Sequence, residues 1–190
     1  MSYKFWILSI GGLMENKNCQ IPEARLLQHL GNLRKMIVHN HELENLSEFV
    51  LHELCSGPCF HVDKAAYFIN NPDFKMLRGV AGYSKQEPQA QLHDTWNNQK
   101  QFITSMKDSA FNQKVRNSLH ESFDKGRNSE KYMIEKLADQ LEIANPAYHV
   151  WNLKHANHGL LIYDPLHHDA QHAQEHLFDS LYYLGFCPVY

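Results

Sequence analysis

Residues 147–163, AYHVWNLKHANHGLLIY, decide the fold class of this chain. Residues 147–153 mix aromatic and β-branched side chains and are predicted to be extended, and the polar segment 154–159 is predicted to turn. Residues 160–163 return as a second apolar strand, which an Asp-Pro pair ends. This β-hairpin lies in a chain whose other clear patterns are helical, so the sequence predicts an α+β fold.

Apolar residues at three- and four-residue steps predict the helices. The pattern is clearest after Pro22, where leucine and isoleucine recur on one face from Leu26 to Ile37. The predicted helical segments are residues 22–37, 43–54, 92–106, 111–123, 128–141 and 170–184. Residues 59–86 are expected to hold irregular structure around short strands, because turn residues and glycines interrupt them. We predict a single α+β domain, residues 1–190, mostly helical with a few short strands that include the C-terminal β-hairpin.

The composition argues against several classes of protein. A net charge of −3 over 190 residues argues against a nucleic-acid-binding protein, which would carry a basic face. No apolar run is long enough to cross a bilayer, so no membrane partner is expected. Residues 5–14 come nearest, but they contain two glycines and are followed by no small-residue cleavage site. They are interpreted as a buried strand rather than a signal peptide, and a cytoplasmic location is the expected default.

Histidine is concentrated toward the C-terminal end. Seven of the fourteen histidines lie between His149 and His176. The last three, at positions 168, 172 and 176, have a spacing that places imidazoles on one face of a helix. From residue 146 onward there are one lysine, no arginine and four acidic residues, which give −3, the whole net charge of the chain. An acidic, histidine-rich segment favours a bound cation.

We therefore predict a transition-metal site, with zinc or iron as the metal, in this segment. The predicted ligands are His155, His158, His168, His172 and His176. Asp164 or Asp169 is predicted to act as general base or to orient a ligand. If the chain is an enzyme, metal-assisted hydrolysis or non-haem iron chemistry fits these residues best. Because the spacing matches no established metal motif, a solvated helix face that uses histidine stays an alternative.

A second set of candidate ligands lies near residue 55. His52, Cys55, Cys59 and His61 place two thiols and two imidazoles within ten residues, and such a set is able to bind zinc. The segment between the cysteines resembles a Cys-Gly-Pro-Cys redox motif with one residue inserted. However, Cys55 is predicted at a helix C-terminus, where the helix dipole disfavours the thiolate. Ordinary buried cysteines, metal ligation and a disulfide switch stay open as alternatives.

Two further patterns have simpler explanations. The His93-Asp94 pair is typical of metal-dependent phosphohydrolases, but a surface pair at the start of a helix explains it as well. Residues 78–85, RGVAGYSK, combine two glycines with two cations, which is one way to hold a phosphate through backbone N–H groups. A tight turn between strands is the favoured interpretation, because the glycine spacing is not that of a phosphate-binding loop.

The alternative function is a non-enzymatic protein-interaction module. The histidine-rich, acidic surface would then respond to pH. Aromatic residues near the end would contact a protein partner or a second copy of the chain; they are Tyr182, Tyr183, Phe186 and Tyr190. The metal hypothesis predicts thermal stability that a chelator lowers, whereas the interaction hypothesis predicts a change with pH alone.

Overall fold

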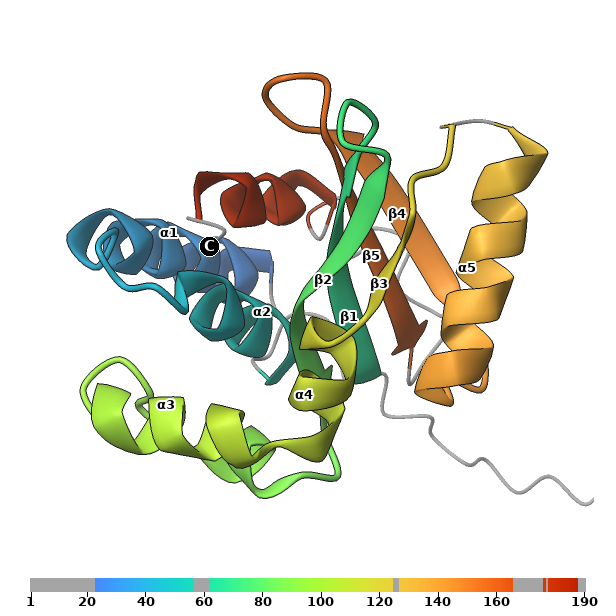
Figure 1. Cartoon of the computed structure of the whole chain (residues 1–190). Helices are drawn as coiled ribbons and strands as arrows, with labels where there is room; N and C mark the ends of the chain where they lie inside the picture. Colours follow the sequence, from blue (N-terminus) through green and yellow to red (C-terminus); the bar gives the residue numbers. More distant parts are fainter. Residues whose placement is uncertain (1–22, 57–61, 125–126, 166–175, 177, 188–190) are drawn as a thin grey trace, which may run out of the picture.

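The computed structural model describes residues 23–56, 62–124, 127–165, 176 and 178–187. Within these residues an antiparallel sheet of five strands has the order β3-β2-β1-β5-β4 (Figure 1). The strands are β1 (Val62–Asn71), β2 (Met76–Ser84), β3 (Leu119–Glu121), β4 (Ala147–Asn152) and β5 (His158–Pro165). The helices are α1 (Glu23–His39), α2 (Leu46–Ser56), α3 (Gln99–Asp108), α4 (Ala110–Arg116) and α5 (Asn128–Leu141), with short 3₁₀ helices η1 (Pro88–Gln91) and η2 (Tyr182–Phe186). The predicted α+β fold class is confirmed.

Helices cover both faces of the sheet (Figure 1). On one face, α1, α2 and residues 181–187 pack against Tyr67 and Trp151. On the other face, α4 and α5 pack against Phe68 and Leu160. Successive residues of β1 therefore enter different hydrophobic cores. This two-sided burial explains why residues 65–69 of β1 are all apolar instead of alternating with polar residues.

The strands are longer than the sequence analysis expects. Residues 62–84 form two strands joined by a turn, in which the Lys75 N–H donates to the Pro72 carbonyl at 3.0 Å. The glycines of residues 78–85 lie inside β2 and not in a turn. Gly79 allows α4 to lie close to the sheet, because a Cβ at this position would be 1.9 Å from the carbonyl oxygen of Val115.

The helix predicted over residues 111–123 is wrong in its second half. α4 ends at Arg116, and residues 119–121 form β3 against the edge of β2. Gly79 donates its N–H to the Ser118 carbonyl at 3.0 Å, which directs the chain from α4 onto that edge. The four-residue apolar step continues to Phe123, but pairing with the open edge of the sheet replaces the last helical turns.

β4 and β5 pair in antiparallel fashion where the sequence predicts a hairpin. Trp151 lies opposite Gly159, and a Cβ on Gly159 would be 2.3 Å from the indole ring. Glycine is therefore required for the tryptophan to lie flat across the neighbouring strand. Of the helix predicted over residues 170–184, residues 178–181 are helical and lead into η2. The strand predicted over residues 5–14 lies outside the described residues.

Candidate ligand-binding cavity

A cavity of about 320 Å³ lies at one end of the sheet, on the face that α1 and α2 cover. Asn70 pairs with His158, so the β1–β2 turn and the β4–β5 turn are at the same end (Figure 1). These two turns and the C-terminal 3₁₀ helix η2 surround the cavity. Its described lining residues are Tyr67, Ile69, Asn71, Met76, Arg78, Leu153, Lys154, His155, Asn157, Leu184, Gly185 and Cys187.

Tyr67 is one of the lining residues, and its hydroxyl is an unsatisfied hydrogen-bonding group. Its side chain is 0% exposed, and its hydroxyl has no hydrogen-bond partner within the described residues. The ring stacks on Trp151, with centroids 5.7 Å apart and planes at 14°. Burial raises the pKa of Tyr67 far above its usual value, and the nearby Cys187 raises this pKa further. The group is therefore a neutral hydroxyl, able both to donate and to accept a hydrogen bond.

Cys187 lies beside this hydroxyl as a protonated thiol. Burial raises the pKa of Cys187 to about 12. Its Sγ donates to the Tyr183 carbonyl at 3.5 Å. A thiol held in this form is a poor nucleophile and a poor metal ligand at neutral pH, because both roles need the thiolate.

The β4–β5 turn forms the opposite rim of the cavity. His155 and Ala156 have φ angles of 58° and 56°, and Asn157 donates its N–H to the Lys154 carbonyl at 3.3 Å. Positive φ at both central positions is the geometry of a type I′ hairpin turn, which normally uses asparagine and glycine. The Asn157 Oδ1 is buried and has no partner in the part of the chain that the structure describes. Both this oxygen and the Tyr67 hydroxyl are buried, so neither is open to a ligand in the cavity.

The structure disperses those predicted metal ligands that it describes. His155 is exposed at the tip of the β4–β5 turn, and His158 begins β5. Asp164 lies near the other end of β5, about 20 Å from His158 at the usual rise per strand residue. His176 is half-buried, and Cys55 is a thiol of α2 that is buried in the hydrophobic core. Across the described ranges, no three His, Cys, Asp or Glu side chains are grouped to hold a metal ion.

The remaining predicted ligands lie outside the described residues. These are His168, His172 and Asp169 of the C-terminal set, and Cys59 and His61 of the second set. The metal hypothesis therefore stays a prediction. The predicted interaction surface also stays a prediction: Tyr182 and Phe186 are exposed, whereas Tyr183 is half-buried.

His52, from the second set, is engaged in the protein interior. Its Nε2 donates to the Gln89 carbonyl at 3.0 Å, and its Nδ1 is 3.2 Å from the Ser56 hydroxyl. The ring packs edge-on against Phe102 and Tyr83. Burial lowers the pKa of His52, which favours the neutral ring. This histidine joins α2 to η1 and α3.

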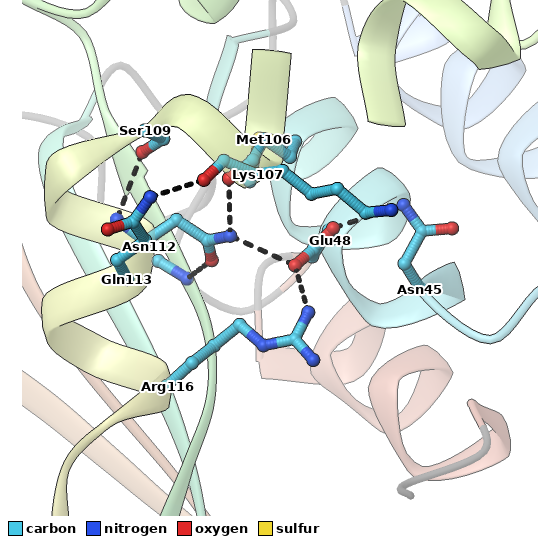
Figure 2. Close-up of polar contacts among 9 residues, drawn as sticks. Asn45, Glu48, Met106, Lys107, Ser109, Asn112, Gln113 and Arg116 are labelled. Carbon is cyan, nitrogen blue, oxygen red and sulfur yellow. Dashed lines mark hydrogen bonds and ion pairs between the residues drawn. The ribbon is translucent and has the colours of Figure 1, made fainter. Parts of the chain in front are cut away.

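A second polar cluster joins α2 to α4 (Figure 2). The buried Glu48 carboxylate accepts hydrogen bonds from Arg116 at 2.6 Å, from Asn112 at 2.9 Å and from Asn45 at 3.0 Å. The Oδ1 of Asn112 in turn accepts from the Gly82 N–H at 2.9 Å. Both oxygens of the carboxylate have partners, so this cluster holds α4 in place and leaves no polar group for a ligand.

The sequence analysis missed Tyr67, Asn157 and Cys187 as members of one site. Tyr67 belongs to a strand whose apolar pattern indicates only burial, and its missing hydrogen bond is visible only in three dimensions. Arg78 was considered as a phosphate ligand on a turn, but it lies in β2 and lines the cavity. The one feature of the sequence that pointed to this region was the Lys154-His155 pair in a predicted turn.

Comparisons with protein families, with characterised proteins and with solved structures found no match. None of the helices in the described ranges is long and apolar enough to cross a membrane.

Proposed function

We propose that this chain is a ligand-binding domain that takes a small molecule into the cavity between the β1–β2 turn, the β4–β5 turn and η2. The observation that carries this proposal is the cavity of about 320 Å³ itself, which the two turns and η2 surround and whose described wall combines apolar and polar side chains.

The composition of the cavity wall supports the same function. Ile69, Met76, Leu153 and Leu184 supply apolar surface. Polar side chains line the rest of the wall: Asn71, Arg78, Lys154, His155 and Asn157. A volume of about 320 Å³ is at the small end of the range of roughly 300–1,000 Å³ that small-molecule sites have. The polar residues that line this cavity include hydrogen-bonding groups and cations, which are groups that bind and orient a ligand.

A fragment panel tests the proposal. Several hundred neutral, cationic and anionic fragments are screened by thermal shift against the wild-type protein and against Ile69→Trp. Ile69 is half-buried on β1 and lines the cavity, so an indole at this position fills it. Leu119→Trp is the matched control, because Leu119 is an exposed strand residue outside the cavity.

A fragment at ten times its Kd stabilises the protein by about 1.4 kcal/mol, which raises Tm by about 3–6 °C for a chain of this size. We expect such shifts in the wild type and in Leu119→Trp, and their loss in Ile69→Trp. A panel without a single hit would overturn the proposal. So would hits that bind Ile69→Trp as well as they bind the wild type.

A second candidate function is the predicted metal site of the C-terminal region. Its support is the spacing of His168, His172 and His176 in the sequence and the exposure of His155, whose side chain has no partner within the described ranges. Elemental analysis of protein purified without a histidine tag tests it. Near-stoichiometric zinc or iron that disappears in the double variant His168→Ala, His172→Ala supports the site, and unchanged metal content in that variant refutes it.

A further inference from the structure

Residues 88–108 contain η1 and α3 and pack on α2 through a hydrophobic cluster of their own. Phe102 and Met106 of α3 pack with Phe49 of α2, and these three buried residues belong to neither of the cores that flank the sheet. The rings of Phe49 and Phe102 have centroids 4.3 Å apart. Figure 1 shows α3 next to α2 and away from the sheet. Because this cluster is small, the segment is able to open while the sheet stays folded.

His52 joins α2 to this segment. The residue is 2% exposed, and its ring packs edge-on against Phe102, with centroids 5.0 Å apart. Its Nε2 donates to the Gln89 carbonyl of η1 at 3.0 Å. Both contacts therefore cross from α2 to residues 88–108, and both are lost when the segment opens. Opening also brings the imidazole into water.

The groups around His52 provide little compensation for a positive charge. On α2, the adjacent Glu53 favours the protonated ring, whereas His93, just after η1, disfavours it. The Glu53 carboxylate is shared with other groups: the Thr95 hydroxyl donates to its Oε1 at 3.1 Å, and its Oε2 is 3.7 Å from the Nε2 of His29 on α1. At low pH a single carboxylate would therefore serve three imidazoles.

The remaining ionisable neighbours add no negative charge. Tyr83 of β2 contacts the ring edge-on and is neutral, because burial raises its pKa. Glu48, one turn earlier on α2, is paired with Arg116 at 2.6 Å. Burial is thus the largest influence on His52 and lowers its pKa below the ordinary value of 6.5. When the segment opens, the ring regains its ordinary affinity for protons, so acidification favours the open form.

We propose that residues 88–108 are a pH-sensitive flap, which is closed over Phe49 and His52 at neutral pH and opens on acidification as His52 takes up a proton. This flap goes beyond the proposed ligand-binding function. It follows Ser84, whereas the cavity is lined by Met76 at the opposite end of β2. Opening the flap uncovers the apolar side chain of Phe49 and leaves the cavity in place, because none of the described lining residues belongs to the flap.

Hydrogen exchange measured by mass spectrometry tests the flap. Protection from exchange, corrected for the intrinsic rate at each pH, is compared at pH 7.5 and pH 5, with and without a low concentration of urea. Peptides from α3 report on the flap, and peptides from α5, on the other face of the sheet, report on the core. His52→Gln removes the imidazole and keeps an N–H donor toward Gln89. His120→Gln is the matched control, because His120 of β3 is half-buried and burial also lowers its pKa, but it lies outside the flap.

We expect the protection of α3 to fall about 10- to 30-fold from pH 7.5 to pH 5, the upper value being the limit for one histidine released to water. This protection should depend weakly on urea and should stay at least about tenfold below that of α5, because the opening is smaller than global unfolding. His52→Gln should lose most of the fall in α3, and His120→Gln should keep it.

Equal protection and equal urea dependence of α3 and α5 would refute the flap, because only global unfolding would then expose the segment. Unchanged protection of α3 in the wild type at the two pH values would refute the pH dependence, and this outcome requires no variant to fold. A full pH effect in His52→Gln would refute the role of His52.

Discussion

Replacing Tyr67 by phenylalanine removes one buried oxygen and leaves the ring stacked on Trp151. In the wild type the hydroxyl is fully buried and has no partner within the described residues. A buried, unsatisfied hydroxyl costs about 1–3 kcal/mol, and its removal recovers that cost. We take about 1–2 kcal/mol, the lower part of this range. Tyr67→Phe should therefore be more stable than the wild type, with Tm about 2–8 °C higher.

Urea unfolding followed by far-UV circular dichroism measures this change without depending on the fluorescence of the stacked Trp151. Tyr148→Phe is the control, because Tyr148 is an exposed tyrosine on β4, and its change should stay within about 0.5 kcal/mol. The same two variants are titrated with any fragment that binds the cavity. Both variants should bind these fragments like the wild type, because the Tyr67 hydroxyl is fully buried and out of a ligand's reach.

The reasoning fails if Tyr67→Phe is destabilised by 1 kcal/mol or more. That result would mean that the hydroxyl makes a hydrogen bond in the ligand-free protein. A variant that gains stability but binds hydroxyl-bearing fragments more weakly would show that a ligand does reach the hydroxyl.

Three other changes test the surrounding structure. Arg116→Met should cost about 2 kcal/mol in urea unfolding, because Glu48 stays buried with two amide donors but no cation; a cost below 0.5 kcal/mol would contradict this. Ala156→Gly should stabilise the protein by about 0.5–1 kcal/mol, because glycine adopts the positive φ of the β4–β5 turn without strain, and an unchanged Tm would argue against that backbone. The pKa of His52 is lowered in the fold, so below its ordinary value of 6.5 the unfolded state binds more protons and stability should fall as the pH falls. Comparing unfolding at pH 7.5 and pH 5 should give a smaller loss for His52→Gln than for the wild type, and equal losses would show that another group is responsible.

The local sequence was enough to predict the elements that pack against a single hydrophobic core. The apolar face of α1 is continuous from Leu26 to Ile37, and the helix occupies those residues because one stripe faces one core. The β4–β5 pair was recognisable for a similar reason, since two short apolar runs flank a polar turn. In both cases neighbouring residues determine the structure, and no distant contact competes with them.

Elements whose pattern is set by distant partners were not predictable. Leu119 continues the four-residue step of α4, yet it lies in β3 because the edge of β2 offers hydrogen bonds that a helix end lacks. Gly79 looks like a turn residue, yet it lies within β2 because α4 packs onto it more closely than any side chain would allow. At both positions two local structures are compatible with the sequence, and a contact with a residue distant in the sequence decides between them.

The sequence alone determined the α+β class, the main helices and the strands on either side of residues 153–157. The tertiary structure alone placed Tyr67 of β1, Lys154 of the β4–β5 turn and Cys187 of the C-terminal segment around one cavity. Strand pairing brings the two turns to the same end of the sheet, and helix packing leaves that end partly open. Whether a buried polar group lacks a hydrogen-bond partner cannot be predicted from its own residue, because it depends on every atom that the fold places nearby.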